Sequence, residues 1–213
     1  MNQKTAMKLF GLLGLLMLLS CGYADRHRNS SLCEQALVDS LEVRVQDSLF
    51  SNVHYSRSQL LEALTQTQDS LVYYRLLALY GKTFFVSSDF DSILYYNRRV
   101  KEFSRNASQS SESLQSPRWN DVLSDVYNIE GNVWMQLNRP DSAIIDYKKA
   151  YGYRLEGKKL HLLPDICINI ADAYLHRSDL AHTASYYRRA LFLCDSLRLS
   201  EHTKFPVYYG LGQ

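Results

Sequence analysis

The chain is poor in residues that break helices, because its 213 residues include only nine Gly and four Pro. It also has no run of five basic residues and no pair of cysteines at the C-x2-C spacing of zinc and redox sites. The motifs G-x-S-x-G and H-E-x-x-H and the phosphate-binding Gly loop are absent. These absences argue against a turn-rich β protein, a nucleic-acid-binding segment, a metal site and an enzyme. We predict no catalytic residue, no metal and no cofactor.

What the chain does contain favours helices that pack on one another. Hydrophobic residues make up 46% of it, and sixteen of its residues are Tyr. Large amphipathic side chains with few breakers suit packed helices. The composition therefore predicts an all-α protein.

The first residues have the features of an export signal. Lys4 and Lys8 precede an apolar run over 9–19, which leads into "LLSC". Eleven helical residues span roughly 16 Å, about half of a bilayer core, so a membrane-spanning helix is not expected. We predict a signal peptide over 1–21. Its removal takes away two basic residues and no acid, which leaves 22 of each. The basic pI therefore does not indicate a nucleic-acid partner.

The "LLSC" ending resembles the lipobox of bacterial lipoproteins. This resemblance implies that Cys21 is diacylated and becomes the mature N-terminus. The protein would then be exported and anchored in the membrane by its N-terminal lipid, facing the periplasm. Plain secretion with a cysteine near the cut, or a short anchor, are the alternatives.

Three stretches of the sequence align with one another, at 81–100, 131–150 and 171–190. Each begins with a small residue, has an aromatic three positions later, and then a polar turn. A second predicted helix follows and carries one or two Tyr. It also carries a small or aliphatic residue, nineteen positions after the small residue that begins the stretch. We expect two antiparallel helices that approach closely at the small residue, and stacking of such pairs. The small residues are Gly81, Gly131 and Ala171, and the aromatics are Phe84, Trp134 and Tyr174.

The pattern resembles the tetratricopeptide repeat, and the second stretch matches it best. That stretch has Tyr127, Gly131, Trp134, Ala143, Tyr147 and Ala150, whereas Ile93, Val100 and Thr183 depart from the pattern in the other two. The spacings of fifty and forty residues exceed the family's usual thirty-four. The resemblance implies a solenoid of antiparallel helix hairpins. Its segments would be an N-terminal helical part over 22–66, repeats over 67–103, 118–158 and 159–203, a Ser-rich loop over 104–117, and the start of a truncated repeat over 204–213.

The N-terminal part is expected to hold two helices. Leu37, Leu41, Val45 and Leu49 recur at helical spacing within 32–50, and a second helix is expected over 56–66. At the other end, a chain that stops at Gln213 inside a repeat would expose apolar surface, and we expect a fragment or a truncated frame.

Members of the tetratricopeptide family present the inner face of their first helices to a peptide or protein. Carried over to this chain, that face would hold a set of polar residues with both signs of charge. Acids among them would repel a carboxylate, so a carboxylate clamp is not expected. The alternative is that these residues are merely solvated. They are Arg75, Lys82, Asp125, Asn128, Asn132, Asn169 and Asp172.

Cys33, Cys167 and Cys194 remain after the signal peptide. As small hydrophobic side chains they would be buried. Alternatively, Cys167 and Cys194, at the start of one helix and the end of its antiparallel partner, could form a disulfide. His176 and His182 straddle a turn and are not expected to share a metal.

Asp-Ser followed by an aliphatic residue or Ala occurs six times. We expect Asp69, Asp89 and Asp179 to cap helices, and Asp91 and Asp141 to lie in first turns, with Pro140 at the helix start. Asp195 falls near a helix end, where capping does not explain it. The tripeptide also resembles the acceptor of an O-glycosylation system in some Gram-negative envelopes. The serines are Ser40, Ser48, Ser70, Ser92, Ser142 and Ser196.

These observations leave three functions open. The leading expectation is a non-catalytic scaffold that binds another protein or a peptide in the cell envelope. The rival is the truncated sensory ectodomain of a membrane-bound transcriptional regulator or histidine kinase. A nutrient-uptake lipoprotein is the third.

Overall fold

The computed structural model describes residues 36–45, 51–107 and 116–212, and these residues form an all-α protein. The predicted signal peptide with Cys21, and also Cys33, Ser48 and Leu49, lie outside the described residues. No β-strand occurs within the described ranges. The all-α prediction is therefore confirmed.

The helices are mostly long and are joined by short turns. Residues 36–45 form a helical segment. After it come α2 (Val53–Gln66), α3 (Ser70–Lys82), the 3-10 helix η1 (Thr83–Ser87), α4 (Phe90–Ala107), α5 (Pro117–Gln136), α6 (Pro140–Leu155), the 3-10 helix η3 (Leu160–Leu162), α7 (Leu163–His176), α8 (Leu180–Ser196) and α9 (Glu201–Leu211).

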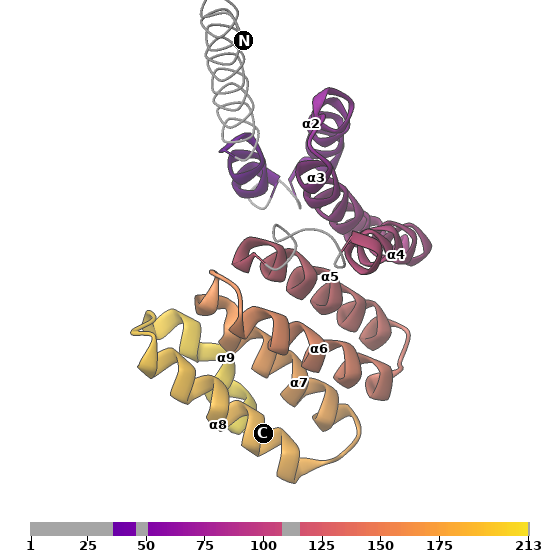
Figure 1. Ribbon diagram of the computed structural model, residues 1–213. Coiled ribbons are helices and arrows are strands. Elements are labelled where there is room, and N and C mark those ends of the chain that lie inside the picture. The colour runs from indigo at the N-terminus through magenta and orange to yellow at the C-terminus, as the bar shows by residue number, and fades with distance from the viewer. Residues whose placement is uncertain (1–35, 46–50, 108–115, 213) are drawn as a thin grey trace, which may run out of the picture.

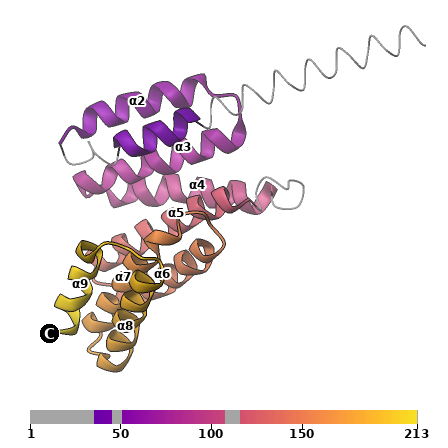
Figure 2. The ribbon, with the colours of Figure 1, turned by 90° about the vertical axis from the view of Figure 1, so that its left-hand side faces the viewer.

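Successive helices stack on one another in chain order. Figure 1 shows α5, α6, α7 and α8 side by side, and Figure 2 shows α2 and α3 at one end of the stack and α8 and α9 at the other. The pairs α3–α4, α5–α6 and α7–α8 are in contact along their length. In addition, α3 contacts α5, α5 contacts α7, and α7 contacts α9. The first helices of successive pairs therefore form one continuous face.

The three turns inside these pairs are built in the same way. Each contains a non-Gly residue in the left-handed region, with φ between 53° and 58°, seven positions after the small residue. In each, the carbonyl of the predicted aromatic accepts a hydrogen bond from the backbone N–H five residues later, at 2.8–3.1 Å. This is the geometry of a Schellman helix end. The left-handed residues are Ser88, Asn138 and Ser178.

Aspartates at the helix starts take the capping roles expected of them. The Asp69 carboxylate accepts hydrogen bonds from the backbone N–H groups of Leu71 and Val72. Asp89 and Asp179 accept in the same way from the third residue after each. The hydrogen bonds from Ser92 and His182 lower the pKa of Asp89 and Asp179 respectively. Asp91 and Asp141 lie in first turns, and α6 begins at Pro140.

Close approach of paired helices depends on glycine, as predicted. At Gly131 a Cβ atom would overlap the ring of Tyr147, and at Gly81 it would lie 2.9 Å from Cβ of Tyr96. Tyr147 is 2% exposed, and its hydroxyl donates a 2.8 Å hydrogen bond to Asn132. Burial raises the pKa of Tyr147 well above its ordinary value. The tyrosine ring thus occupies the space that the absent side chain leaves.

One expectation about the N-terminal half needs correction, and another is made more specific. In the segment 36–45 the buried side chains are Val38, Leu41 and Val45, whereas Leu37 is 44% exposed. The buried face therefore follows an i, i+3, i+7 spacing that includes Val38. The Ser-rich loop was expected over 104–117, yet α4 continues to Ala107 and α5 starts at Pro117. Ser104 is held in the helix, where its hydroxyl accepts a 3.0 Å hydrogen bond from the Trp119 indole N–H.

Within the described part of the chain, no helix is both long and apolar enough to cross a membrane. Helix α9 leaves several large side chains exposed. Phe205 is 73% and Tyr209 72% exposed, with Tyr208 and Leu211 also at the surface. One face of α9 is therefore uncovered in this structure.

Candidate functional site

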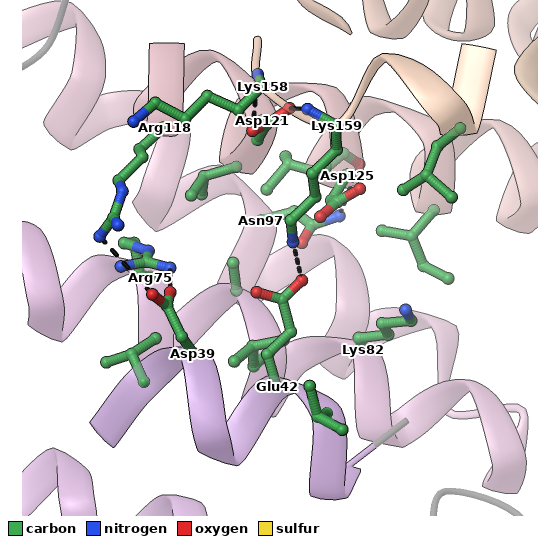
Figure 3. Close-up of a pocket in the computed structure, with 18 of the residues that line it drawn as sticks. Asp39, Glu42, Arg75, Lys82, Asn97, Arg118, Asp121, Asp125, Lys158 and Lys159 are labelled. Carbon is green, nitrogen blue, oxygen red and sulfur yellow. Dashed lines mark hydrogen bonds and ion pairs between the residues drawn. The ribbon is translucent and has the colours of Figure 1, made fainter. Parts of the chain in front are cut away.

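A cavity of about 430 Å³ lies against the face formed by the first helices (Figure 3). Its walls come from the segment 36–45, from α3, from α5 and from the connection between α6 and α7, with Asn97 of α4 at its back. On α3, Arg75, Ala78, Leu79 and Lys82 share one helical face. The volume falls in the range of small-ligand pockets.

The wall contributed by α5 is fixed by a buried charge network. The Arg154 guanidinium, 1% exposed, pairs with Asp121 at 2.7 Å and also with Asp125. Asp121 further accepts the backbone N–H groups of Lys158 and Lys159, at 3.0 and 3.2 Å. A carboxylate with these partners satisfies its charge away from water. Asp121 therefore ties the α6–α7 connection to the cavity wall.

Gly157 is required where that connection passes Asp121. A Cβ atom at Gly157 would collide with the Asp121 carboxylate. Without that space the two backbone N–H groups after it would be displaced from the carboxylate. The glycine thus allows the loop to close one end of the cavity.

The opposite wall, formed by segment 36–45, is held by two acids. Asp39 accepts from Arg75 at 2.7 Å and lies 3.6 Å from the Arg118 guanidinium. Glu42 pairs with Lys159, which is 117 residues away in the sequence. Figure 3 shows this pair reaching across the space between segment 36–45 and the α6–α7 connection. The cavity is therefore spanned by an ion pair between distant parts of the chain.

Several polar groups at the cavity have no partner among the described residues. The Arg75 Nη1 and Asn97 Oδ1 atoms are buried without a hydrogen bond. The Lys82 side chain, at the edge of the same space, takes part in no ion pair or hydrogen bond within the described ranges. Buried polar atoms without partners are uncommon in folded proteins. The Lys82 ammonium is thus left open to a bound molecule, whereas the Arg75 Nη1 and Asn97 Oδ1 atoms are closed off from solvent.

The seven residues predicted for the inner face divide into two groups. Arg75, Lys82 and Asp125 line the cavity. The other four do not line it and bond within the fold instead. Asn169 donates to Asn128 at 3.0 Å, Asn132 accepts from Tyr147, and Asp172 accepts from the hydroxyl of Tyr187.

Sequence reasoning missed the acids and lysines that complete the cavity. Asp39, Glu42 and Lys159 are brought together only by the stacking of distant helices, and no local spacing marks them. Asp121 carried a weak signal, because it lies one turn before Asp125 on the same helix face. Asn97 was not singled out because it falls on the second helix of its pair.

The remaining predicted sites are distributed over the surface and the core. Cys167 and Cys194 are both buried free thiols, and burial raises the pKa of Cys167 to about 12. In this structure they are buried as small hydrophobic side chains, and the alternative disulfide between them is not formed. Ser40, Ser70 and Ser196 are exposed, whereas Ser92 and Ser142 are half-buried. The described residues contain no His, Cys, Asp and Glu cluster suited to a metal.

Comparisons with known proteins leave the family open. No protein-family model matches the chain, and no curated protein matches it. Among solved structures, the chain is similar to BtubC (BKLC) from P. vanneervenii, with a TM-score of 0.40 and 16% identity. That match covers 83% of this chain and 85% of the other. A likeness of this size carries no argument about fold or function.

Proposed function

We propose that the chain is a non-catalytic scaffold built as a tetratricopeptide-type solenoid, and that it binds a protein or peptide partner at the cavity. The cavity and its unpartnered groups carry this proposal. The side chains of Arg75, Asn97 and Lys82 border one space together with apolar residues of α3 and α5. A partner that supplies an acceptor for the Lys82 ammonium and covers the apolar wall would satisfy a group that the fold leaves open.

The repeated build of the helix pairs supports the solenoid. Three pairs share the same left-handed turn position and the same hydrogen bond from the aromatic carbonyl. Contacts between α3, α5, α7 and α9 give the continuous first-helix face that such arrays use for binding. The longer spacing of forty and fifty residues sets this chain apart from the usual repeat.

We further propose that the scaffold is exported and held in the envelope membrane by a lipid on Cys21. The support is the signal-like run that ends in "LLSC". Replacing Cys21→Ala is expected to release the protein from the membrane fraction. Equal membrane retention of the two forms would contradict the lipid anchor and would leave the cavity proposal intact.

The binding proposal is tested by placing a photo-crosslinking side chain at Lys82 in the full chain. The matched control places it at Arg188, an exposed position on α8 away from the cavity. We expect a discrete adduct with one protein from position 82 and none from position 188. The same set of adducts from both positions, or none from position 82, would count against a partner at the cavity.

A further inference from the structure

Segment 36–45 forms one wall of the cavity and lies there in the manner of a bound peptide. Its buried side chains, Val38, Leu41 and Val45, are 1–3% exposed and form one apolar stripe at i, i+3 and i+7. This stripe packs in one cluster with apolar side chains of α2 and α3. Leu37, on the other side of the segment, is 44% exposed. The segment is therefore a short amphipathic helix laid on the surface of two longer helices.

Two acids beside the apolar stripe meet cations of two other elements (Figure 3). Asp39 accepts a 2.7 Å hydrogen bond from Arg75 of α3, and Glu42 pairs with Lys159 of the α6–α7 connection. Neither cation has another ion pair among the described residues. The Arg75 Nη1 atom is buried without a hydrogen bond. The segment thus satisfies this guanidinium only in part.

Removal of the segment would uncover a cationic face with an apolar floor. Arg75 and Lys159 would lose their acids, and the Lys82 ammonium at the same cavity has no partner within the described ranges. The two acids of α5 at this cavity stay paired with Arg154, so they do not repel a carboxylate as free acids would. A helix that fits this face needs an apolar stripe with carboxylates beside it, as the segment itself has.

We propose that the partner presents an acidic amphipathic helix and binds by taking the place of segment 36–45. This inference rests on the proposed function and adds to it the class of partner and a competing segment within the chain. Ten residues that bury three apolar side chains are held by few contacts, and such elements open locally more readily than a core. Because the segment belongs to the same chain, it competes at a high effective concentration and lowers the apparent affinity for the partner.

The test measures binding of a fluorescent peptide of residues 36–45 to the full chain by fluorescence anisotropy. A hydrocarbon staple joins positions 36 and 40, which are exposed in the segment, and keeps the peptide helical. In the chain, Leu41→Asp removes a buried anchor of the segment, whereas the control Leu37→Asp makes the same change on its exposed side. We expect Leu41→Asp to bind the peptide about tenfold or more tighter than the wild type and Leu37→Asp do.

A second variant releases the segment without changing its apolar stripe. Asp39→Asn with Glu42→Gln in the chain keeps the size of both side chains, removes both ion pairs, and is also expected to bind the peptide several-fold tighter than the wild type does. The same two changes in the peptide are expected to weaken its binding to the Leu41→Asp chain about fivefold or more. Equal peptide affinities of the wild type and both released variants would overturn the displacement. Equal affinities of the charged and the neutral peptide would overturn the acidic class.

Photo-crosslinking separates a failure of this inference from a failure of the proposed function. The crosslinking side chain at position 82 is placed in the wild-type chain and in the chain with Asp39→Asn and Glu42→Gln. A higher yield of the partner adduct from the double variant supports displacement of the segment. An equal or lower yield would overturn the inference and leave the proposed function standing, because the partner would then bind beside the segment. Absence of the adduct from both chains would count against the proposed function itself.

Discussion

Substitution of one glycine tests the packing on which the helix pairs depend. In Gly131→Ala the new methyl group would overlap the buried ring of Tyr147. That ring is held by its hydrogen bond to Asn132 and is 2% exposed, so it has little room to move. The matched control is Gly152→Ala in α6, where a Cβ atom would meet nothing within 4 Å.

The two substitutions are expected to change the free energy of unfolding in opposite directions. Alanine in place of glycine stabilises a helix by about 0.5–1 kcal/mol, and this gain applies to both variants. Overpacking a filled core costs about 1–3 kcal/mol, and it applies only at Gly131. Gly131→Ala is therefore expected to lower the free energy of unfolding by up to about 2.5 kcal/mol, whereas Gly152→Ala raises it by up to about 1 kcal/mol.

Urea unfolding followed by circular dichroism measures both variants against the wild type. The difference between the two free energies of unfolding removes the common propensity gain and gives the overpacking cost itself. Equal midpoints for the two variants would refute the close packing of Gly131 against Tyr147. A higher midpoint for Gly131→Ala than for Gly152→Ala would refute it more strongly.

Three further predictions concern caps, buried charge and thiols. Asp69→Ala removes the side-chain cap of α3 and is expected to cost about 1 kcal/mol, whereas Asp91→Ala, exposed in the first turn of α4, should cost only a few tenths in the same urea assay. Arg154→Met leaves Asp121 buried without its cation and is expected to lower the free energy of unfolding by about 3–5 kcal/mol. The control Arg139→Met, at an exposed position, should change it little. Similar urea midpoints for the two variants would contradict the network. The buried Cys167 thiol, with its pKa raised to about 12, stays protonated at pH 8 and should resist alkylation in the native protein, as peptide mapping would show; rapid native labelling at Cys167 would contradict its burial.

Much of the helical arrangement could be predicted because its signals are local. Asp69, Asp89 and Asp179 each stand a fixed distance before an apolar helix face, and capping depends only on the next few residues. Gly81 and Gly131 mark close approach because nothing larger fits there. Leu37 and Val38 both continue a helical spacing toward Leu41, so only packing on α2 and α3 selects Val38 for the buried face.

The candidate site was predicted less well because its contacts are distant in sequence. Arg75, Lys82 and Asp125 follow from the face of the first helices, whereas Glu42 and Lys159 meet only after several helix pairs have stacked. Asn132 and Asp172 were assigned to the open face, yet each accepts a tyrosine hydroxyl from the facing helix. A periodic pattern gives the face of a helix, and it does not say which polar group across the interface will take a side chain's hydrogen bonds.

The central claim is that a protein or peptide partner binds at the cavity. It is tested most directly by measuring how tightly the crosslinked partner binds a variant whose cavity is filled. Ala78→Trp places a large ring inside the cavity, while Ala181→Trp adds the same ring at an exposed position of α8. With the purified partner, Ala78→Trp is expected to weaken binding at least tenfold, about 1.4 kcal/mol, and Ala181→Trp to leave it unchanged. An unchanged affinity for Ala78→Trp would contradict a partner site at this cavity.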